Sequence, residues 1–322
     1  MTTDHQMEML EAVQRPIETA QGLANPHYID PGVYEEEKHA VLFSSWSALA
    51  VVADVPNVGD AKPVEFLGVP LLLIRDKAGI VRVFQNICRH RGMILVSKAR
   101  KFEGAIRCPY HSWCYAPDGK LISTPHVGGP GHNTHDSIDK ATLGQIEVRS
   151  HIWFETVFIN DDGTAPPFEA VHADLIERWS EFDQPMFHGG EDSRFRLEAK
   201  TNWKLAVENY CESYHLPWIH PGLNSYSRLE DHYNIEKLHK FSGQGTLVYR
   251  QIQDDEGNAF PDFQALSEKW ETGGEYLAVY PNVLLGVQRD HTFVIILEPV
   301  TYELTSEHIH LFYAAAETDA AL

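Results

Sequence analysis

The 322-residue sequence predicts an α+β protein in which an all-β module is followed by a module that mixes strands with helices. Between residues 45 and 158, short apolar runs alternate with turn residues, a pattern that favours strands. The pair Pro166-Pro167 marks the start of a second region, and the densest helical pattern of the chain follows at 203–214. Strand-like runs surround that helix, at 195–200, 245–251, 283–288, 292–297 and 308–314.

The remaining elements follow from local signals. The runs 71–74 and 80–84 flank Asp76-Lys77-Ala78-Gly79 and predict a β-hairpin. Pro117-Asp118-Gly119 predicts a turn, because Pro presets φ and Gly tolerates positive φ. Shorter candidates are helices at 31–42, 168–182 and 262–272, strands at 105–108, 112–115 and 120–122, and a Gly/His-rich loop at 128–135.

Composition excludes several classes of protein. The formal net charge of −20 argues against a basic nucleic-acid surface and against attraction to an anionic membrane. No apolar run approaches the ~20 residues that span a bilayer. A signal peptide begins with a positively charged region, whereas the first twelve residues contain no Lys or Arg. Four cysteines are too few for a disulfide scaffold. We therefore expect a cytoplasmic protein with reduced thiols.

Two Cys/His pairs form the first constellation. Cys88 and His90 are separated by one residue, Cys108 and His111 by two, and seventeen residues lie between the pairs. Ordinary buried residues do not explain two such pairs, each followed by turn residues. A structural Cys₂His₂ zinc site is the serious alternative, but such sites usually pair Cys with Cys and His with His. Here each pair supplies one of each, which suits a [2Fe–2S] cluster with both cysteines on one iron and both histidines on the other.

This motif resembles that of Rieske proteins, in which the second pair usually reads C-P-Y-H-G-W-x-Y. Tyr110, Trp113 and Tyr115 match the pattern, Ser112 replaces the usual Gly with another small residue, and Cys114 falls at the variable place. The resemblance implies that the two Cys/His pairs ligate a [2Fe–2S] cluster and that Cys114 does not take part.

The second constellation lies in the predicted helix 203–214 and just after it. Glu208, Glu212 and His215 fall at i, i+4 and i+7, on one helix face. Pro217 should break the helix and let His220 turn back towards His215. Two converging histidines and a carboxylate are the ligands of a ferrous 2-His-1-carboxylate site, whereas the pattern in isolation also fits a solvated charged face.

After a Rieske motif, this segment resembles the mononuclear iron motif of Rieske non-haem iron oxygenase α subunits. The resemblance implies that His215 and His220 bind Fe(II) and that Glu212, where Asp is commoner, bridges to a Rieske histidine of the neighbouring subunit; the rival interpretation makes Glu212 itself an iron ligand. The third ligand is normally an aspartate on a C-terminal helix. Asp290 and Asp319 are poor candidates, and we expect that the chain ends before that helix.

The resemblance also implies the architecture and the partners. We expect an arm (1–44) packed on the catalytic domain, an all-β Rieske [2Fe–2S] domain (45–158), and a mononuclear iron catalytic domain (159–322) with a helix-grip-like antiparallel sheet. The chain has no G-x-G-x-x-G dinucleotide motif, so a separate NAD(P)H-dependent reductase is implied. O₂ as co-substrate and a homotrimer follow from the same resemblance.

Residues 217–223 and 226–233 look like the branch of these oxygenases that hydroxylates or N-demethylates quaternary ammonium compounds such as choline, glycine betaine and carnitine. An aromatic ring-hydroxylating dioxygenase α subunit is the alternative. A zinc-stabilised binding protein would be colourless, and a pure Rieske electron carrier would not need the second module. Cation–π faces are expected from some of six aromatic residues, the others being core: Tyr210, Tyr214, Trp218, Tyr226, Tyr233 and Tyr280.

Overall fold

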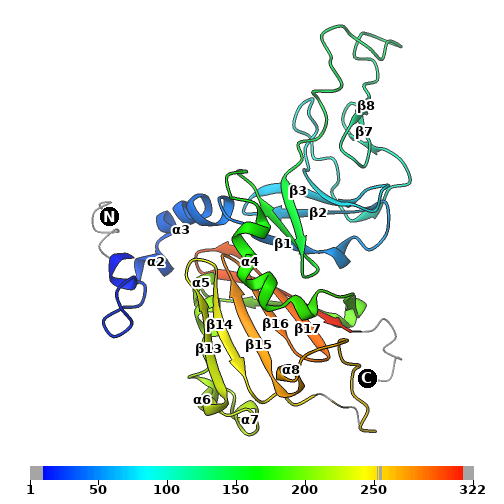
Figure 1. Ribbon diagram of the computed structural model, residues 1–322. Helices are drawn as coiled ribbons and strands as arrows, with labels where there is room; N and C mark the ends of the chain where they lie inside the picture. Colours follow the sequence, from blue (N-terminus) through cyan, green and yellow to red (C-terminus); the bar gives the residue numbers. More distant parts are fainter. Residues whose placement is uncertain (1–9, 252, 254–255, 315–322) are drawn as a thin grey trace.

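The computed structural model describes residues 10–251, 253 and 256–314 and divides them into an all-β part and a part built on one large sheet (Figure 1). Helices α2 (Pro26–Ile29) and α3 (Pro31–Glu37) precede both, and a π-helical turn (Lys38–Phe43) completes the helix predicted at 31–42. In the described residues, no helix is long and apolar enough to cross a membrane.

Three small antiparallel sheets build the all-β part, in the orders β4-β3-β2-β5, β6-β7-β8 and β1-β10-β9. The predicted hairpin is confirmed as β3 and β4, and its turn is held by Asp76, whose Oδ1 accepts from the backbone N–H of Ala78 and Ile80. The strands are β1 (Ser47–Val51), β2 (Asp60–Phe66), β3 (Val69–Arg75), β4 (Val81–Gln85), β5 (Arg100–Lys101), β6 (Ile106–Arg107), β7 (Cys114–Tyr115), β8 (Leu121–Ser123), β9 (Arg149–Trp153) and β10 (Thr156–Asn160).

An eight-stranded antiparallel sheet forms the second part, in the order β11-β18-β17-β16-β15-β14-β13, with β12 also paired to β18. Its strands are β11 (Phe187–His188), β12 (Arg194–Ala199), β13 (His232–Lys237), β14 (Phe241–Thr246), β15 (Gly274–Val279), β16 (Val283–Val287), β17 (His291–Thr301) and β18 (Leu304–Tyr313). The strand predicted at 245–251 is wrong beyond Thr246, and the helix predicted at 262–272 is reduced to α8 (Lys269–Thr272).

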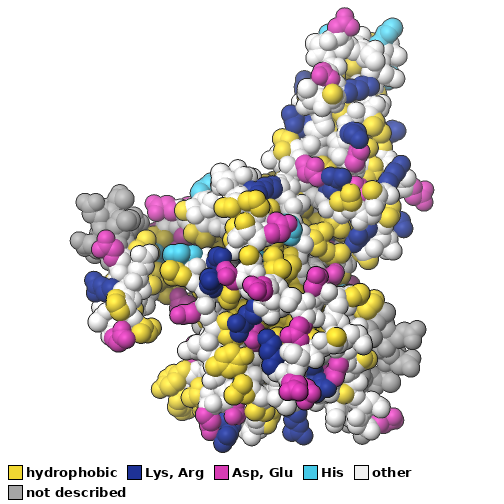
Figure 2. Space-filling model, in the orientation of Figure 1, with side chains coloured by type: hydrophobic (Ala, Val, Ile, Leu, Met, Phe, Trp, Pro, Cys, Tyr) yellow, Lys and Arg dark blue, Asp and Glu magenta, His cyan; other side chains and the backbone are white. Residues whose placement is uncertain are grey.

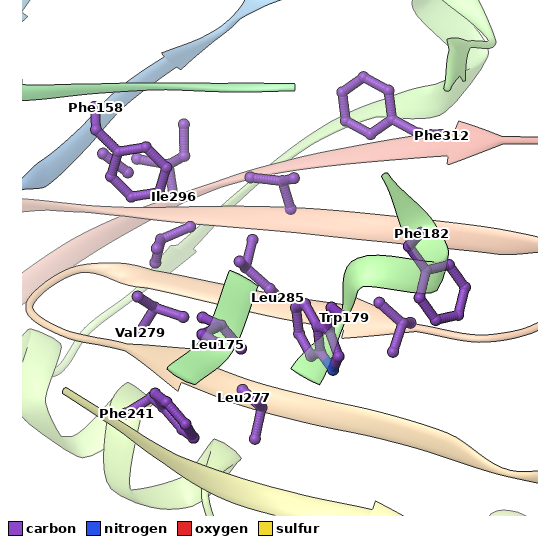
Figure 3. Close-up of a cluster of buried hydrophobic side chains, with 14 of the residues drawn as sticks. Phe158, Leu175, Trp179, Phe182, Phe241, Leu277, Val279, Leu285, Ile296 and Phe312 are labelled. Carbon is purple, nitrogen blue, oxygen red and sulfur yellow. The ribbon is translucent and has the colours of Figure 1, made fainter. Parts of the chain in front are cut away.

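Helices cover both faces of this sheet. Leu277 and Val279 of β15 join the core beneath α4 (Phe168–Arg178), where Leu175 and Trp179 lie against the sheet (Figure 3). Ala278, between them in the strand, packs with residues of α5 (Trp203–Tyr210) on the opposite face. Alternate side chains of a strand point to opposite faces, so the sheet is buried on both sides, and the candidate site below lies on the α5 face.

The core under α4 also receives side chains from the all-β part. Trp46, Ala48 and Phe158, from the segment around β1 and from β10, belong to the same buried cluster as Val283 and Leu285 of β16. The β1-β10-β9 sheet and the eight-stranded sheet therefore share one hydrophobic core rather than meeting at a solvated surface.

Asn282, 1% exposed, adds a polar tie across this contact. Its Oδ1 accepts from Ala48 N at 2.8 Å, and its Nδ2 donates to the carbonyl oxygens of Ala48 and Leu297 at 2.9 and 3.0 Å. One side chain thus pairs three buried backbone groups of β1 and β17, as buried polar groups require.

The N-terminal helices contact the second part through polar bonds. Tyr28 Oη donates to Glu208 at 2.7 Å, and Tyr34 Oη donates to the Pro299 carbonyl at 2.8 Å. The Lys204 ammonium binds Glu37 at 2.6 Å. These bonds fix the segment against β17 and against α5, the helix that precedes the predicted iron histidines.

Candidate functional site

The four predicted cluster ligands lie on two loops of the same form, one after β4 and one between β6 and β7. In each loop the cysteine carbonyl accepts from the N–H four residues later, Gly92 to Cys88 at 2.9 Å and Ser112 to Cys108 at 3.1 Å. Gly92 and Ser112 both have positive φ, 69° and 59°. Ser112 therefore adopts a backbone conformation that favours Gly, which explains why Gly is usual there.

The loops bring the four side chains together. The rings of His90 and His111 have centroids 4.6 Å apart, and His90 stacks on Trp113 at 4.8 Å. Cys88 and Cys108 are 2% and 1% exposed and belong to the same buried cluster as Trp113. Two buried thiols and two neighbouring imidazoles form the donor set that the sequence motif predicts.

Tyr115 ties the first loop to β7. Its hydroxyl lies 3.3 Å from Cys88 Sγ and accepts from Arg89 N at 3.0 Å. Burial raises the pKa of the Cys88 thiol and neighbouring Cys108 adds to the rise, whereas the Tyr115 hydrogen bond opposes it. Buried sulfur of this kind enters a metal site as thiolate, with Tyr115 as its hydrogen-bond donor.

The second constellation is arranged differently from the sequence prediction. Helix α5 ends at Tyr210, and Glu212 lies in a turn rather than on the helix face predicted for Glu208, Glu212 and His215. Gln244 of β14 accounts for the end, because its amide nitrogen Nε2 donates to the Tyr210 and Glu212 carbonyls at 3.5 and 3.1 Å. Carbonyls at a helix end need such partners.

The two histidines nevertheless come together. His215 precedes the short helix α6 (Leu216–Ile219), and His220 follows it, before α7 (Pro221–Asn224). Their ring centroids are 5.3 Å apart. The sequence predicted that a break at Pro217 would bring His220 back towards His215. In the structure, one short helical turn that contains Pro217 brings the two rings together.

Glu212 turns its carboxylate onto its own loop. Oε1 lies 2.5 Å from Nδ1 of His215, and Oε2 accepts from the backbone N–H of His215 at 3.3 Å and from that of Tyr214. Because a carboxylate only accepts, His215 donates from Nδ1, which leaves Nε2 for a metal. In this arrangement Glu212 orients a ligand imidazole, and its side chain remains 43% exposed.

A cavity of about 330 Å³ opens beside His215 and His220 on the α5 face of the sheet. Five aromatic side chains line its other walls, beside polar and aliphatic residues. They come from α5, from the segments after α7 and β14, and from strands β15 and β17: Tyr210, Tyr226, Tyr249, Tyr276 and Phe293. Of the six aromatic residues predicted for a cation site, only Tyr210 and Tyr226 line it. Tyr249, Tyr276 and Phe293 escaped sequence reasoning because they come from separate strands or loops far along the chain.

The remaining candidates do not complete the iron site. Asp290 is fully buried and binds Tyr249 and His291, and it does not line the cavity. Asp319 lies outside the described residues. In the described part of the chain, no three His, Cys, Asp or Glu side chains are grouped to hold a single ion. A [2Fe–2S] cluster does not need such a group, because each iron would take two side chains.

Comparisons with known proteins agree with this arrangement. Residues 45–138 match the family model described as Rieske [2Fe-2S] domain, and residues 189–321 match Ring hydroxylating alpha subunit (catalytic domain). Together they cover more than half of the chain, in the order in which the two sites occur. The chain belongs to the Rieske oxygenases.

Several curated Rieske oxygenases are similar to this chain in sequence. The carnitine monooxygenase oxygenase subunit of Escherichia coli (strain K12) is 28% identical over 298 residues, 90% of this chain and 74% of that protein. The glycine betaine monooxygenase oxygenase subunit of Chromohalobacter salexigens is 27% identical over 65% of this chain and 45% of that protein. The biphenyl dioxygenase subunit alpha of Paraburkholderia xenovorans is 30% identical over 64% and 46%.

Solved structures share the fold. A quaternary ammonium Rieske monooxygenase, in a study of carnitine oxidation by gut microbiota, superposes with a TM-score of 0.72 at 25% identity over 91% of this chain and 76% of that one. Naphthalene 1,2-dioxygenase from Rhodococcus sp. gives a TM-score of 0.77 at 18% identity over 99% and 78%. The expected fold class, an all-β Rieske domain followed by an antiparallel catalytic domain, is thereby confirmed.

Membership of this family implies a [2Fe–2S] cluster and a mononuclear iron. The donor chemistry fits both groups: two buried thiols with two imidazoles on paired loops for the cluster, and two imidazoles facing a cavity for the iron. The cluster carries single electrons, at a potential raised by the neutral histidines. An iron held by two histidines and a carboxylate would supply O₂ activation, and of these ligands the described residues supply the two histidines, His215 and His220.

Proposed function

We propose that this Rieske oxygenase hydroxylates or N-demethylates a small quaternary ammonium substrate in the cavity beside His215 and His220. The observation that carries the proposal is the cavity itself, whose lining includes five Tyr or Phe rings and, among the described residues, no Lys or Arg. Aromatic faces attract quaternary ammonium groups. Relatives named for carnitine and glycine betaine support the same substrate class.

An aromatic substrate is the second candidate, because rings also line sites for flat apolar molecules. Biphenyl dioxygenase is similar over 64% of this chain, against 90% for the carnitine enzyme. Turnover separates the two candidates. With a reductase and NADH, we expect product from carnitine, glycine betaine or choline and none from biphenyl or naphthalene. Turnover of only the hydrocarbons would reverse the assignment.

In the proposed site, Cys88, His90, Cys108 and His111 hold the cluster, and His215 and His220 hold the iron. His215→Ala or His220→Ala should lose the mononuclear iron and keep the cluster absorption, because the cluster ligands lie on loops of the all-β part, after β4 and between β6 and β7. His308→Ala is the control: this histidine is on β18, bound to Glu298 at 2.7 Å and away from the cavity. Unchanged iron content in both site variants would contradict the assignment.

Glu212 has a positioning role in this proposal. The carboxylate holds His215 in the tautomer that presents Nε2, and this 43% exposed side chain would accept a proton from a cluster histidine of a neighbouring chain in addition to the bonds within its own loop. Glu212→Gln should keep both metal centres and slow the oxidation of a pre-reduced cluster in a single turnover. Loss of iron would instead make Glu212 a ligand. Glu230→Gln, an exposed carboxylate, serves as the control.

We propose that the protein works as a ring of subunits, a homotrimer, with electrons supplied by a separate reductase. In Figure 1 the cluster loops beside β7 lie at the far end of the molecule from α6, so a chain's own two sites are remote from each other. Apolar side chains are exposed beside the iron histidines, and Figure 2 shows such side chains gathered over α6: Tyr214 at 71%, Trp218 at 66% and Ile219 at 66%.

The cluster loops of a neighbouring subunit would cover that apolar surface. A group of large apolar side chains exposed together is typical of a protein–protein contact. Trp218→Asp should therefore shift the sedimentation of the holoprotein towards monomer and abolish turnover while leaving the cluster spectrum intact. A wild-type protein that is monomeric at full turnover would contradict the ring.

A further inference from the structure

A buried carboxylate stands directly behind one wall of the cavity. Asp290, in the turn between β16 and β17, is 0% exposed, and both of its oxygens accept from the Tyr249 hydroxyl, at 2.9 and 3.2 Å. Tyr249 itself lines the cavity. One ring therefore has its face or edge at the cavity and its hydroxyl on a negative charge.

Besides Tyr249, two groups face Asp290. His291 lies 2.9 Å away through Nδ1 and must donate, because the carboxylate only accepts. The guanidinium of the preceding residue, Arg289, also faces Asp290 electrostatically, but it is hydrogen-bonded to Asp262, at 2.9 Å from Nε to Oδ1. Burial raises the pKa of the Tyr249 phenol and the charge of Asp290 adds to the rise, so the phenol stays protonated and keeps donating.

A tyrosine that donates to a buried carboxylate becomes a better partner for a cation. The hydrogen bond moves electron density into the ring, and the ring quadrupole attracts a cation at its face. The carboxylate charge acts in the same direction, and a buried charge is weakly screened by water or salt. A neutral molecule of the same shape receives neither benefit.

We infer that Asp290, acting through Tyr249, is a positioning residue that makes this cavity selective for a positively charged ammonium group over a neutral group of the same size. The inference rests on the proposed function, since it names the feature that selects the substrate class. It gives the buried carboxylate, a poor candidate for the third iron ligand, a different role.

Binding to the holoprotein tests the inference without turnover. Choline and its neutral carbon isostere 3,3-dimethylbutan-1-ol are titrated calorimetrically into the wild-type protein, Asp290→Asn, Tyr249→Phe and the double variant. Glu307→Gln is the charge-matched control, because it removes a half-buried carboxylate on β18 that does not line the cavity. We expect the wild-type protein to prefer choline at least about tenfold.

Asp290→Asn should remove most of that preference, because it should weaken the binding of choline and leave the binding of the alcohol unchanged. Tyr249→Phe should also remove most of the preference for choline. The double variant should lose little more than either single variant, and Glu307→Gln should keep the wild-type preference. An equal loss for both ligands would mean that Asp290 only maintains the fold, and would overturn the inference, as would equal or absent choline binding by the wild-type protein. If Asp290→Asn fails to fold, Tyr249→Phe decides alone.

The two proposals fail separately. Asp290-dependent preference for choline, without turnover of any quaternary ammonium compound, would refute the proposed reaction and leave the inference standing. Turnover of such a compound, with an unchanged preference in Asp290→Asn and Tyr249→Phe, would refute the inference alone.

Discussion

Tyr115→Phe removes one hydroxyl and, with it, two contacts of the first cluster loop. The phenol oxygen lies 3.3 Å from Cys88 Sγ and 3.0 Å from Arg89 N, and Tyr115 is 0% exposed, so no water replaces it. A buried N–H without a partner costs about 1–3 kcal/mol. We expect the free energy of unfolding to fall by about that amount.

The same variant should change the reduction potential of the cluster. Reduction adds negative charge near the ligand sulfur, and a hydrogen bond to that sulfur stabilises the reduced state more than the oxidised one. If the difference is about 1.4 kcal/mol, one hydrogen bond to a charged group, the one-electron potential falls by about 59 mV. The expected shift is therefore a decrease on the order of 30–60 mV.

A spectroelectrochemical titration of the purified holoprotein measures this shift. Tyr110→Phe is the matched control, since Tyr110 lies in the second cluster loop but is 59% exposed. An intact visible spectrum with a potential equal to that of the wild-type protein would show that Tyr115 does not donate to Cys88, and the reasoning would be refuted.

Three further predictions concern stability. Ser112 has φ 59°, a conformation that costs about 1 kcal/mol for a residue with Cβ. Ser112→Gly should therefore raise the free energy of unfolding by about 0.5 kcal/mol, because the greater flexibility of Gly in the unfolded chain offsets part of the gain, whereas Gly92→Ser should lower it by about 1 kcal/mol. Urea titrations of both variants measure the two changes. Asn282→Ala leaves three buried backbone groups unpaired and should cost about 3 kcal/mol or more in the same assay, and a loss below about 1 kcal/mol would contradict the tie between β1 and β17. Burial lowers the pKa of His172 to about 4, against about 6.5 in the unfolded chain, so its contribution is complete above pH 6.5 and is lost as the pH falls towards 4; His172→Phe should flatten that decline between pH 7 and 5, and an unaltered slope would exclude His172 as a cause.

The cluster loops could be predicted from sequence because the residues that close each loop are local. Each Cys/His pair lies within four residues, and each loop closes by a bond from the cysteine carbonyl to the N–H four residues later. The hairpin β3–β4 was predictable for the same reason, since Asp76 sets its turn within a few residues.

The iron and substrate region was predictable only in part, because distant strands shape it. A helical pattern continues through Glu212, but Gln244 of β14 binds the carbonyls where α5 ends, and no local signal announces that contact. Tyr249 and Asp290 likewise meet only when the chain between them folds back to β17. Sequence periodicity can identify candidate ligands that lie on one helix or loop. It cannot identify a cavity wall whose side chains come from several distant strands.

The shared core beneath α4 has a consequence for exchange of modules between members of the family. Trp46, Ala48 and Phe158 are buried against the catalytic sheet rather than within the small sheets alone. A chimera joined near residue 158 would therefore place foreign side chains into a packed interior, where misfit commonly costs several kcal/mol. For the same reason, heating should bleach the cluster and unfold the catalytic sheet in a single cooperative transition, and a successful graft must carry the matching face of α4 and β16 with it.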